Sequence, residues 1–339
     1  MITEKTGILL VNLGTPASPT KKAVRQYLKE FLDDARVIDL PWGIRKALLH
    51  GFILPFRPAK SAQAYSAIWD KEQGSPLLFH SQAMALALQA SLGEDYQVEL
   101  GMRYGQPSIS HAFEKLMDAR CTHIIAIPLF PQYSSSANGS AMEKILTLAA
   151  SKWNVPAITL RQNFYNHPDY IAAQAAVIAP FLTQAIDGVL FSYHSLPQRH
   201  IDKSQSDCAA VCVNHQECPE ITSANNRCYR AQCYATSHLL TKALNLVPEK
   251  IAVAFQSRLG RTVWIGPEIH RVMRTMRTRQ MKNILVVCPS FVADCVETLE
   301  EIGIRARAEW QKLGGESFTL VPCMNQHPAW IQALKNLVL

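Results

Sequence analysis

A histidine and two acidic residues follow apolar runs in the second half of the chain. His194 ends the run Gly188–Tyr193, and Asp294 and Glu297 follow the run Ile284–Cys288. In sheets of parallel strands, ligands bind outside the carboxyl ends of the strands, so these side chains are expected at a functional edge. A neutral imidazole accepts a proton or offers a lone pair to a metal, and a carboxylate can also do both. The pattern indicates an enzyme that transfers protons or handles a metal ion.

The spacing of the two carboxylates adds to this interpretation. Asp294 and Glu297 stand three positions apart, and the residues from Glu297 to Glu301 are typical of a helix start, which predicts both on one helix face. The helix macrodipole also favours acidic residues in a first turn, but Asp294 is embedded in an apolar run. A histidine at a strand end can equally be a hydrogen-bonded turn residue. The functional interpretation therefore depends on the three side chains together.

Five of the nine cysteines are concentrated between Cys208 and Cys233, with the spacing C-x3-C-x5-C-x9-C-x4-C. We expect no secretory leader in this chain, and this density then indicates metal ligation rather than disulfides. The paired C-x2-C knuckles common in zinc sites are missing. Iron–sulfur and zinc both remain open, with unligated thiols as a third alternative.

Composition argues against several classes of protein. Lys and Arg outnumber Asp and Glu by 34 to 27, but these residues are scattered and form no basic block, so we expect no nucleic-acid partner. No apolar stretch approaches the length that spans a bilayer, which predicts a cytoplasmic protein. There is no P-loop, no G-x-G-x-x-G and no H-E-x-x-H string, so we expect chemistry that needs no nucleotide.

Short apolar runs alternate with longer amphipathic stretches, which predicts parallel strands covered by helices. Four such runs occur in each half, and several have similar exits, which indicates a duplicated fold. We expect an α/β protein of two similar Rossmann-like lobes, residues 1–165 and 166–339. Each lobe is a four-stranded parallel sheet flanked by helices, with a cleft between the lobes and a cysteine-rich insertion at 207–234. The predicted strands are Gly7–Asn12, Gln97–Gly101, His123–Leu129, Ala157–Leu160, Gly188–Tyr193, Ile251–Gln256, Ile284–Cys288 and Phe318–Pro322.

Several unusual strings occur in a fixed order along almost the whole chain. They are Gly7–Pro16, Tyr27–Leu32, Gly74–Pro76, Gly101–Gly105, Pro131–Ser136, Phe255–Arg258 and Cys288–Leu299. In this order they resemble the ferrochelatases, which insert ferrous iron into a porphyrin in the last step of haem synthesis. The resemblance implies Fe²⁺ and protoporphyrin IX as substrates.

The resemblance also implies a role for each site residue. His194 is the pyrrole proton acceptor or a metal ligand, and Glu297 with Asp294 forms the carboxylate side of the proton and metal path. Trp264 is equally compatible with a core anchor. The positions that match the lining of the porphyrin pocket are Ser75, Arg103, Tyr104 and Trp264.

One stretch departs from the family pattern. After Trp264–Pro267 the family usually continues with a Thr-Asp pair, whereas this chain has Glu268–Arg271. The usual capping chemistry is lost, which puts the local helix start in doubt. Because His194, Asp294 and Glu297 are all present, we interpret the departure as a local variation.

Some bacterial ferrochelatases carry a 2Fe–2S cluster in an insertion at this place, and the segment from Cys228 to Cys233 resembles its C-terminal end. Four ligands are needed and five cysteines are present. Cys208 is then the spare thiol, and His215 could compete. The expected ligands are Cys212, Cys218, Cys228 and Cys233.

Two further expectations concern partners and alternatives. The stretch Val37–Pro58 combines apolar residues with Arg and Lys, which is compatible with a core helix and loop or with a lip that touches the membrane surface. The second interpretation predicts peripheral contact with the inner membrane. The alternative functions are a chelatase for another tetrapyrrole, such as coproporphyrin, or another metal, and a non-enzymatic haem-binding or redox-sensing protein.

Overall fold

The computed structural model describes residues 5–183, 185–204, 212, 218–258, 260 and 262–339. The chain divides into two compact units, one of residues 1–130, 134–163 and 334–339 and one of residues 131–133 and 164–333. Residues 334–339 were predicted to lie in the second lobe, but they belong to the first unit. Lys335 Nζ donates to Ser91 O at 2.8 Å and Arg161 Nε donates to Leu337 O at 2.9 Å, which ties this end to the first unit.

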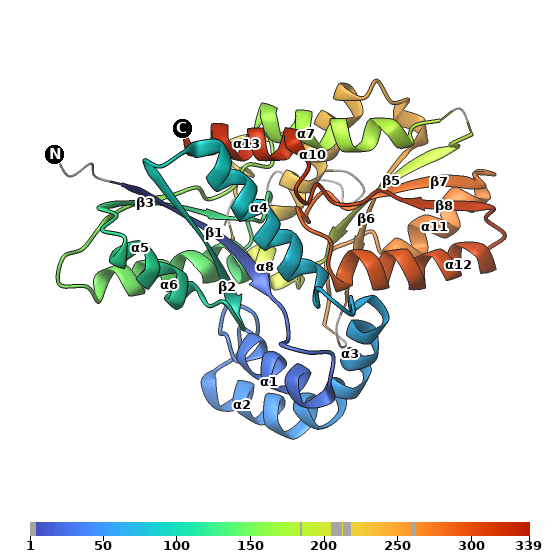
Figure 1. The fold of residues 1–339 in the computed structure, drawn as a ribbon. Coiled ribbons are helices and arrows are strands. Elements are labelled where there is room, and N and C mark those ends of the chain that lie inside the picture. The colour runs from blue at the N-terminus through green and yellow to red at the C-terminus, as the bar shows by residue number, and fades with distance from the viewer. Residues whose placement is uncertain (1–4, 184, 205–211, 213–217, 259, 261) are drawn as a thin grey trace. The chain divides into compact units, whose positions relative to one another are not determined.

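The first unit contains one sheet of parallel strands in the order β2-β1-β3-β4 (Figure 1). Leu10 in the centre of β1 pairs with Leu100 of β2 and Ile127 of β3. All three side chains are buried, as expected for a parallel sheet with helices on both faces. The strands are β1 (Thr6–Gly14), β2 (Tyr96–Tyr104), β3 (His123–Pro128) and β4 (Ala157–Leu160).

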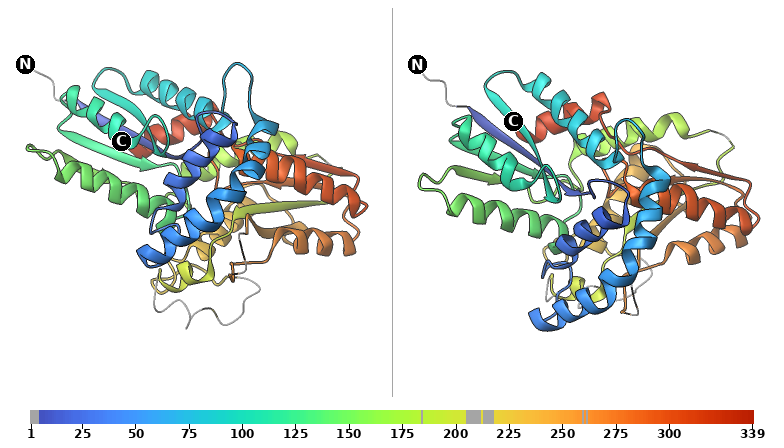
Figure 2. Two further views of the ribbon diagram at one scale, coloured as in Figure 1. Left: turned by 90° about the horizontal axis from the view of Figure 1, so that it is seen from below. Right: turned by 60° about the horizontal axis from the view of Figure 1, so that its bottom comes forward.

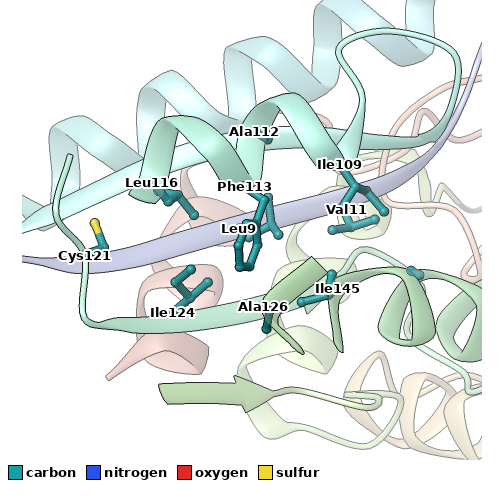
Figure 3. Close-up of a cluster of buried hydrophobic side chains, with 12 residues drawn as sticks. Leu9, Val11, Ile109, Ala112, Phe113, Leu116, Cys121, Ile124, Ala126 and Ile145 are labelled. Carbon is teal, nitrogen blue, oxygen red and sulfur yellow. The ribbon is translucent and has the colours of Figure 1, made fainter. Parts of the chain in front are cut away.

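Helices α5 and α6 cover one face of this sheet. Figure 3 shows Phe113 and Leu116 of α5 packed against Leu9 of β1 and Ile124 of β3, and all four are fully buried. Helix α1 packs against α3, and the two helices lie side by side in every view (Figures 1 and 2). The helices are α1 (Lys21–Leu32), α2 (Trp42–Leu48), π-helical η1 (Leu49–Ile53), α3 (Leu54–Ile68), α4 (Pro76–Leu92), α5 (Ile109–Asp118), π-helical η2 (Ser135–Gly139) and α6 (Ser140–Ala150).

The second unit repeats the same topology, with parallel strands in the order β6-β5-β7-β8. The predicted fold class and all eight predicted strands are confirmed, with differences of a few residues at their ends. The strands are β5 (Gly188–His194), β6 (Ile251–Gln256), β7 (Asn283–Val287) and β8 (Ser317–Leu320). The helices are α7 (Pro168–Ile178), η3 (Ala179–Phe181), α8 (Gln198–Asp202), α10 (Tyr229–Ala243), η4 (Pro248–Lys250), α11 (Ile269–Thr278), π-helical η5 (Glu297–Ala306), α12 (Arg307–Lys312) and α13 (Pro328–Val338), of which residues 334–338 belong to the first unit.

Packing in the second unit follows the same logic. Met273 and Met276 of α11 and Trp310 of α12 are buried in one cluster with Ile284 and Val286 of β7. The amphipathic stretches predicted from the sequence therefore supply the layer that covers the sheet. Among the described residues, no helix is both long enough and apolar enough to cross a bilayer.

Candidate active site

His194 is the last residue of β5, which lies between β6 and β7. The chain passes from β5 to β6 on one side of this strand pair and from β7 to β8 on the other side, so the order of strands reverses between β5 and β7. Sheets of this class bind ligands outside the carboxyl ends of the two strands at such a reversal. The half-buried imidazole stands at this point. Topology thus puts a base where an α/β protein can use it.

Hydrogen bonds around His194 determine the tautomer and the orientation of its imidazole. Nδ1 lies 2.5 Å from the Ser195 carbonyl oxygen. A carbonyl only accepts, so Nδ1 donates the proton, and in the neutral ring Nε2 retains its lone pair. The backbone N–H of His194 donates to Ser290 Oγ at 3.4 Å, and the Tyr229 hydroxyl donates to the His194 carbonyl at 2.9 Å. The ring is held in one tautomer, in which Nε2 is the nitrogen that carries the lone pair.

Glu297 is connected to His194 through a buried glutamine. Gln256, the last residue of β6, pairs in register with His194. Its Nε2 donates to the Glu297 carbonyl at 2.9 Å, while its Oε1 accepts from Ser192 Oγ at 2.6 Å. Glu297 opens η5, so the amide of Gln256 ties the start of this helix to β5. Sequence reasoning missed Gln256, although an amide at the end of an apolar strand was a signal.

Asp294 has surroundings that differ from those predicted. It lies before η5 begins, so the prediction that Asp294 and Glu297 share one helix face is wrong. Its buried carboxylate accepts from Thr298 Oγ1 at 3.1 Å, from the Cys323 N–H at 3.2 Å and from Asn325 Nδ2 at 2.8 Å. A buried carboxylate needs such donors, and here they tie the loop after β8 to the start of η5.

Trp264 lies beside the His194 turn, because it forms an antiparallel bridge with Pro197. Ser195 Oγ donates to the neighbouring Ile265 carbonyl at 2.8 Å. The doubtful helix start does form, since α11 begins directly after Glu268, whose side chain caps no backbone group. That side chain instead accepts from Arg258 Nη1 at 2.9 Å.

In the first unit, Arg103 and Tyr104 end β2 and share a carboxylate that sequence reasoning missed. Arg103 Nη2 lies 2.6 Å from Asp34 Oδ2, and the Tyr104 hydroxyl donates to the same oxygen at 2.8 Å. Ser140 Oγ donates to it as well, at 2.5 Å. Burial raises the pKa of Asp34, but hydrogen bonds from Ser140, the Arg36 N–H and Tyr104, with the Arg103 charge, lower it overall. Burial and the Asp34 charge raise the pKa of Tyr104.

Ser75 is the residue before α4, and it is buried. Its hydroxyl pairs with Thr15 Oγ1 at 2.8 Å, and Thr15 directly follows β1. Because Gly14 of β1 pairs with Tyr104 of β2, the structure brings Ser75, Arg103 and Tyr104 to the carboxyl edge of one sheet.

Four of the five clustered cysteines are described. Cys218, Cys228 and Cys233 are buried and Cys212 is half-buried, while Cys208 and His215 lie outside the described residues. The pKa of the Cys218 thiol is raised to about 12, mainly by burial and also by the nearby Cys228 and Cys212, although the Arg230 charge acts to lower it. Arg230 Nη1 donates to Cys218 Sγ at 2.8 Å. Within the described part of the chain, no group of three or more His, Cys, Asp or Glu side chains is arranged as a metal site.

Comparisons with known proteins agree with this fold. Among solved structures, the chain resembles SirB from Bacillus subtilis with Fe³⁺ at a TM-score of 0.54 and 14% identity, covering 98% of this chain and 94% of that one. It also resembles the sirohydrochlorin chelatase SirB from Bacillus subtilis subspecies spizizenii in complex with cobalt, at 0.53 and 13%, covering 98% and 93%. At these identities the likeness shows the fold alone.

Sequence relatives are much closer. A ferrochelatase from Legionella pneumophila (strain Paris) is 52% identical over 332 residues, covering 98% of both chains. A ferrochelatase from a Coxiella burnetii strain is 46% identical over 334 residues, covering 98% of this chain and 93% of the relative. The family model for ferrochelatase matches residues 5–339. The chain therefore belongs to the ferrochelatase family, the lyases that insert ferrous iron into a porphyrin in haem biosynthesis.

Proposed function

We propose that this ferrochelatase metallates protoporphyrin IX, with His194 as the acceptor of the pyrrole protons. One observation carries the assignment: Nδ1 of His194 is committed to the Ser195 carbonyl, so Nε2 is the nitrogen with a lone pair. Metallation removes the pyrrole N–H protons and strips water from Fe²⁺. The first event needs positioned proton acceptors, and the second needs side chains that replace water as ligands of Fe²⁺.

The carboxylates take different roles in this proposal. Glu297 is half-buried at the start of η5 and accepts a proton or receives the arriving Fe²⁺. Asp294 supports it: three donors occupy its carboxylate and hold the loop from which η5 begins. We therefore propose that Asp294 positions Glu297 and does not itself take part in the proton transfer.

The porphyrin side of the proposal involves Ser75, Arg103, Tyr104 and Trp264. Ser75 and Tyr104 are buried and hydrogen-bonded within the protein, so they shape a wall. The side chain of Arg103 is 19% exposed, and among the contacts of the described residues its Nη1 engages in none. That group can donate to a porphyrin carboxylate.

The proposal is tested by anaerobic incubation of the purified protein with Fe²⁺ and protoporphyrin IX. We expect porphyrin fluorescence to disappear as the haem spectrum appears, and coproporphyrin under the same conditions measures the preference. Turnover of coproporphyrin alone would contradict the substrate assignment, and turnover of neither would contradict the activity.

We also propose that the cysteines bind a 2Fe–2S cluster. The donor chemistry fits: the thiols of Cys218, Cys228 and Cys233 are buried within electrostatic reach of one another, and Cys212 acts on Cys218. The guanidinium of Arg230 at Cys218 Sγ compensates negative charge on thiolate ligands. When bound, such a cluster supplies a redox-active, coloured centre that cross-links the segment.

The cluster proposal predicts colour. Protein purified without oxidants should show broad visible absorption that dithionite bleaches, with about two irons and two sulfides per chain. Cys228→Ser or Cys233→Ser should lose the colour and lower the unfolding temperature, because ligation and folding are coupled. Cys208→Ser is the control and should keep both. Colourless protein with one zinc per chain would overturn the cofactor assignment but not the chelatase assignment.

We propose that the segment Trp42–Phe56 touches a membrane surface. Helix α2 has no buried residue, which argues against a core helix at Trp42–Leu48, whereas Leu49 and Leu54 just after it are buried. Trp42 and Phe56 are 70% and 76% exposed, and Ile44 and Phe52 are also exposed. Aromatic side chains of this kind insert at the boundary between headgroups and acyl chains, where a hydrophobic porphyrin partitions.

Vesicle co-sedimentation tests the membrane proposal. Replacing both Trp42 and Phe56 with serine should lower the vesicle-bound fraction, with the partition coefficient falling at least about tenfold, because burial of each side chain contributes about 1.5–3 kcal/mol. Trp153→Ser is the matched control, since that tryptophan is 99% exposed but lies outside the segment. Equal binding by the double variant and the parent would count against the proposal.

A further inference from the structure

The first turn of α10 contacts both the cysteines and the His194 strand end. Tyr229 is buried and lies between Cys228 and Cys233 in the sequence. Its hydroxyl donates to the His194 carbonyl at 2.9 Å. The same hydroxyl is within hydrogen-bonding reach of the Cys233 thiol and of Ser290. One side chain therefore joins an expected cluster ligand to the residue expected to perform the proton chemistry.

The contact acts on the part of the backbone that orients the imidazole. The peptide between His194 and Ser195 is fixed at its carbonyl by Tyr229 and at its N–H by the Gln256 carbonyl, at 2.7 Å. The next carbonyl, that of Ser195, accepts from His194 Nδ1. Rotation of the fixed peptide would therefore displace the carbonyl that sets the tautomer and direction of the ring.

A second contact from the same turn reaches the neighbouring loop. Arg230 donates from Nη1 to Cys218 Sγ at 2.8 Å and from Nε to the Gly266 carbonyl at 2.9 Å. Gly266 lies two residues after Trp264, in the loop that bridges Pro197 of the His194 turn. The segment Cys218–Cys233, called the cysteine segment below, is thus tied to the candidate site at two points.

We propose that Tyr229 is a positioning residue through which the cysteine segment holds the imidazole of His194 in its working orientation. The inference rests on the proposed function, because it takes His194 as the proton acceptor and the cysteines as cluster ligands. It assigns the segment a purpose other than electron transfer: an intact segment fixes Tyr229, and Tyr229 fixes the peptide that orients the base.

The chain offers a matched control for this contact. The Tyr193 hydroxyl pairs with Ser237 Oγ at 2.7 Å, so it joins β5 to α10 just as Tyr229 does, but without contact to the His194 carbonyl. Tyr193→Phe and Tyr229→Phe each remove one buried hydroxyl between the same strand and the same helix. A purely structural role would give both variants the same behaviour.

The first experiment compares these variants in the full chain with its cluster. For Tyr229→Phe we expect visible absorption and iron content equal to the parent, a kcat lower by about tenfold to a hundredfold, and an unchanged KM for porphyrin. The NMR shifts of the His194 imidazole nitrogens should change, because the ring is no longer held in one tautomer. Tyr193→Phe should keep the kcat and the imidazole shifts of the parent.

The second experiment tests the coupling to the cysteines. Cys233→Ala and the double variant with Tyr229→Phe complete a mutant cycle, read by the imidazole shifts and by kcat. If Tyr229 is the route, the two changes are non-additive, and Tyr229→Phe adds little once Cys233 is lost. Additive effects would overturn the coupling.

Other outcomes separate the inference from the function on which it rests. A Tyr229→Phe protein with parent kcat and imidazole shifts overturns the inference and leaves the role of His194 intact. A colourless Tyr229→Phe protein also overturns it, because Tyr229 would then act on the cluster. Turnover by His194→Ala would instead contradict the proposed function. If Tyr229→Phe does not fold, Ser290→Ala is used instead, because it removes the acceptor of the His194 backbone N–H. It is judged by the same imidazole shifts and kcat.

Discussion

Replacing His194 with alanine is expected to abolish iron insertion while leaving porphyrin affinity within about tenfold of the parent. A positioned acid–base group contributes about 10²- to 10⁴-fold to a rate, and Nε2 of His194 is the lone pair that the Ser195 contact leaves available. The affinity is preserved because the large apolar macrocycle, rather than one imidazole, supplies most of the binding area. Anaerobic turnover and porphyrin fluorescence titration measure the two quantities separately.

The control for this prediction is His238→Ala. His238 is exposed on α10, and its loss should leave turnover within about twofold of the parent, as for ordinary surface substitutions. Near-normal turnover by His194→Ala would show that another group accepts the pyrrole protons.

For Glu297→Gln we expect a loss in kcat of about a hundredfold or more. The amide keeps the shape of the side chain but cannot carry a proton. The backbone contact from Gln256 uses the Glu297 carbonyl, so the substitution leaves the tie between β6 and η5 in place. The variant should therefore fold normally, and the pH–rate profile should lose the contribution of this carboxylate.

Glu300→Gln is the matched control in the same helix. Glu300 accepts from Arg305 Nε at 2.9 Å; the Arg305 side chain is 56% exposed and that of Glu300 is 12% exposed, so the loss of this pair should lower stability by about 1 kcal/mol and leave the reaction unchanged. If Glu297→Gln matched the parent in rate and in pH profile, the carboxylate of Glu297 would be structural.

The sequence alone predicted the strands, the duplication and the family. Strand runs such as Gly188–Tyr193 are recognisable because burial on both faces of a parallel sheet demands continuous apolar residues. His194, Ser75 and the cysteines were identified because their types and neighbouring strings are local features. Such patterns can be recognised from the sequence because they depend only on neighbouring residues and not on which distant segments pack together.

The tertiary structure decided how the polar side chains are paired. Asp294 was expected on a helix face with Glu297, but its burial requires donors, and Asn325 and the Cys323 N–H supply them from a loop that only folding brings near. Asp34 likewise meets Arg103 across 69 positions of sequence. No periodicity signals such pairs, because they depend on which segments pack together.

The same reason explains why the residues around His194 were missed. Gln256 and Tyr229 look like ordinary members of a strand and a helix, and their roles follow from hydrogen bonds to His194 and Glu297 that the order of strands creates. Hydrophobic patterning determined which segments are buried, since it depends only on the side chains along each segment. Hydrogen bonding between buried groups of distant segments is a property of the packed fold, so the geometry that holds the base and the carboxylate was decided only by tertiary structure.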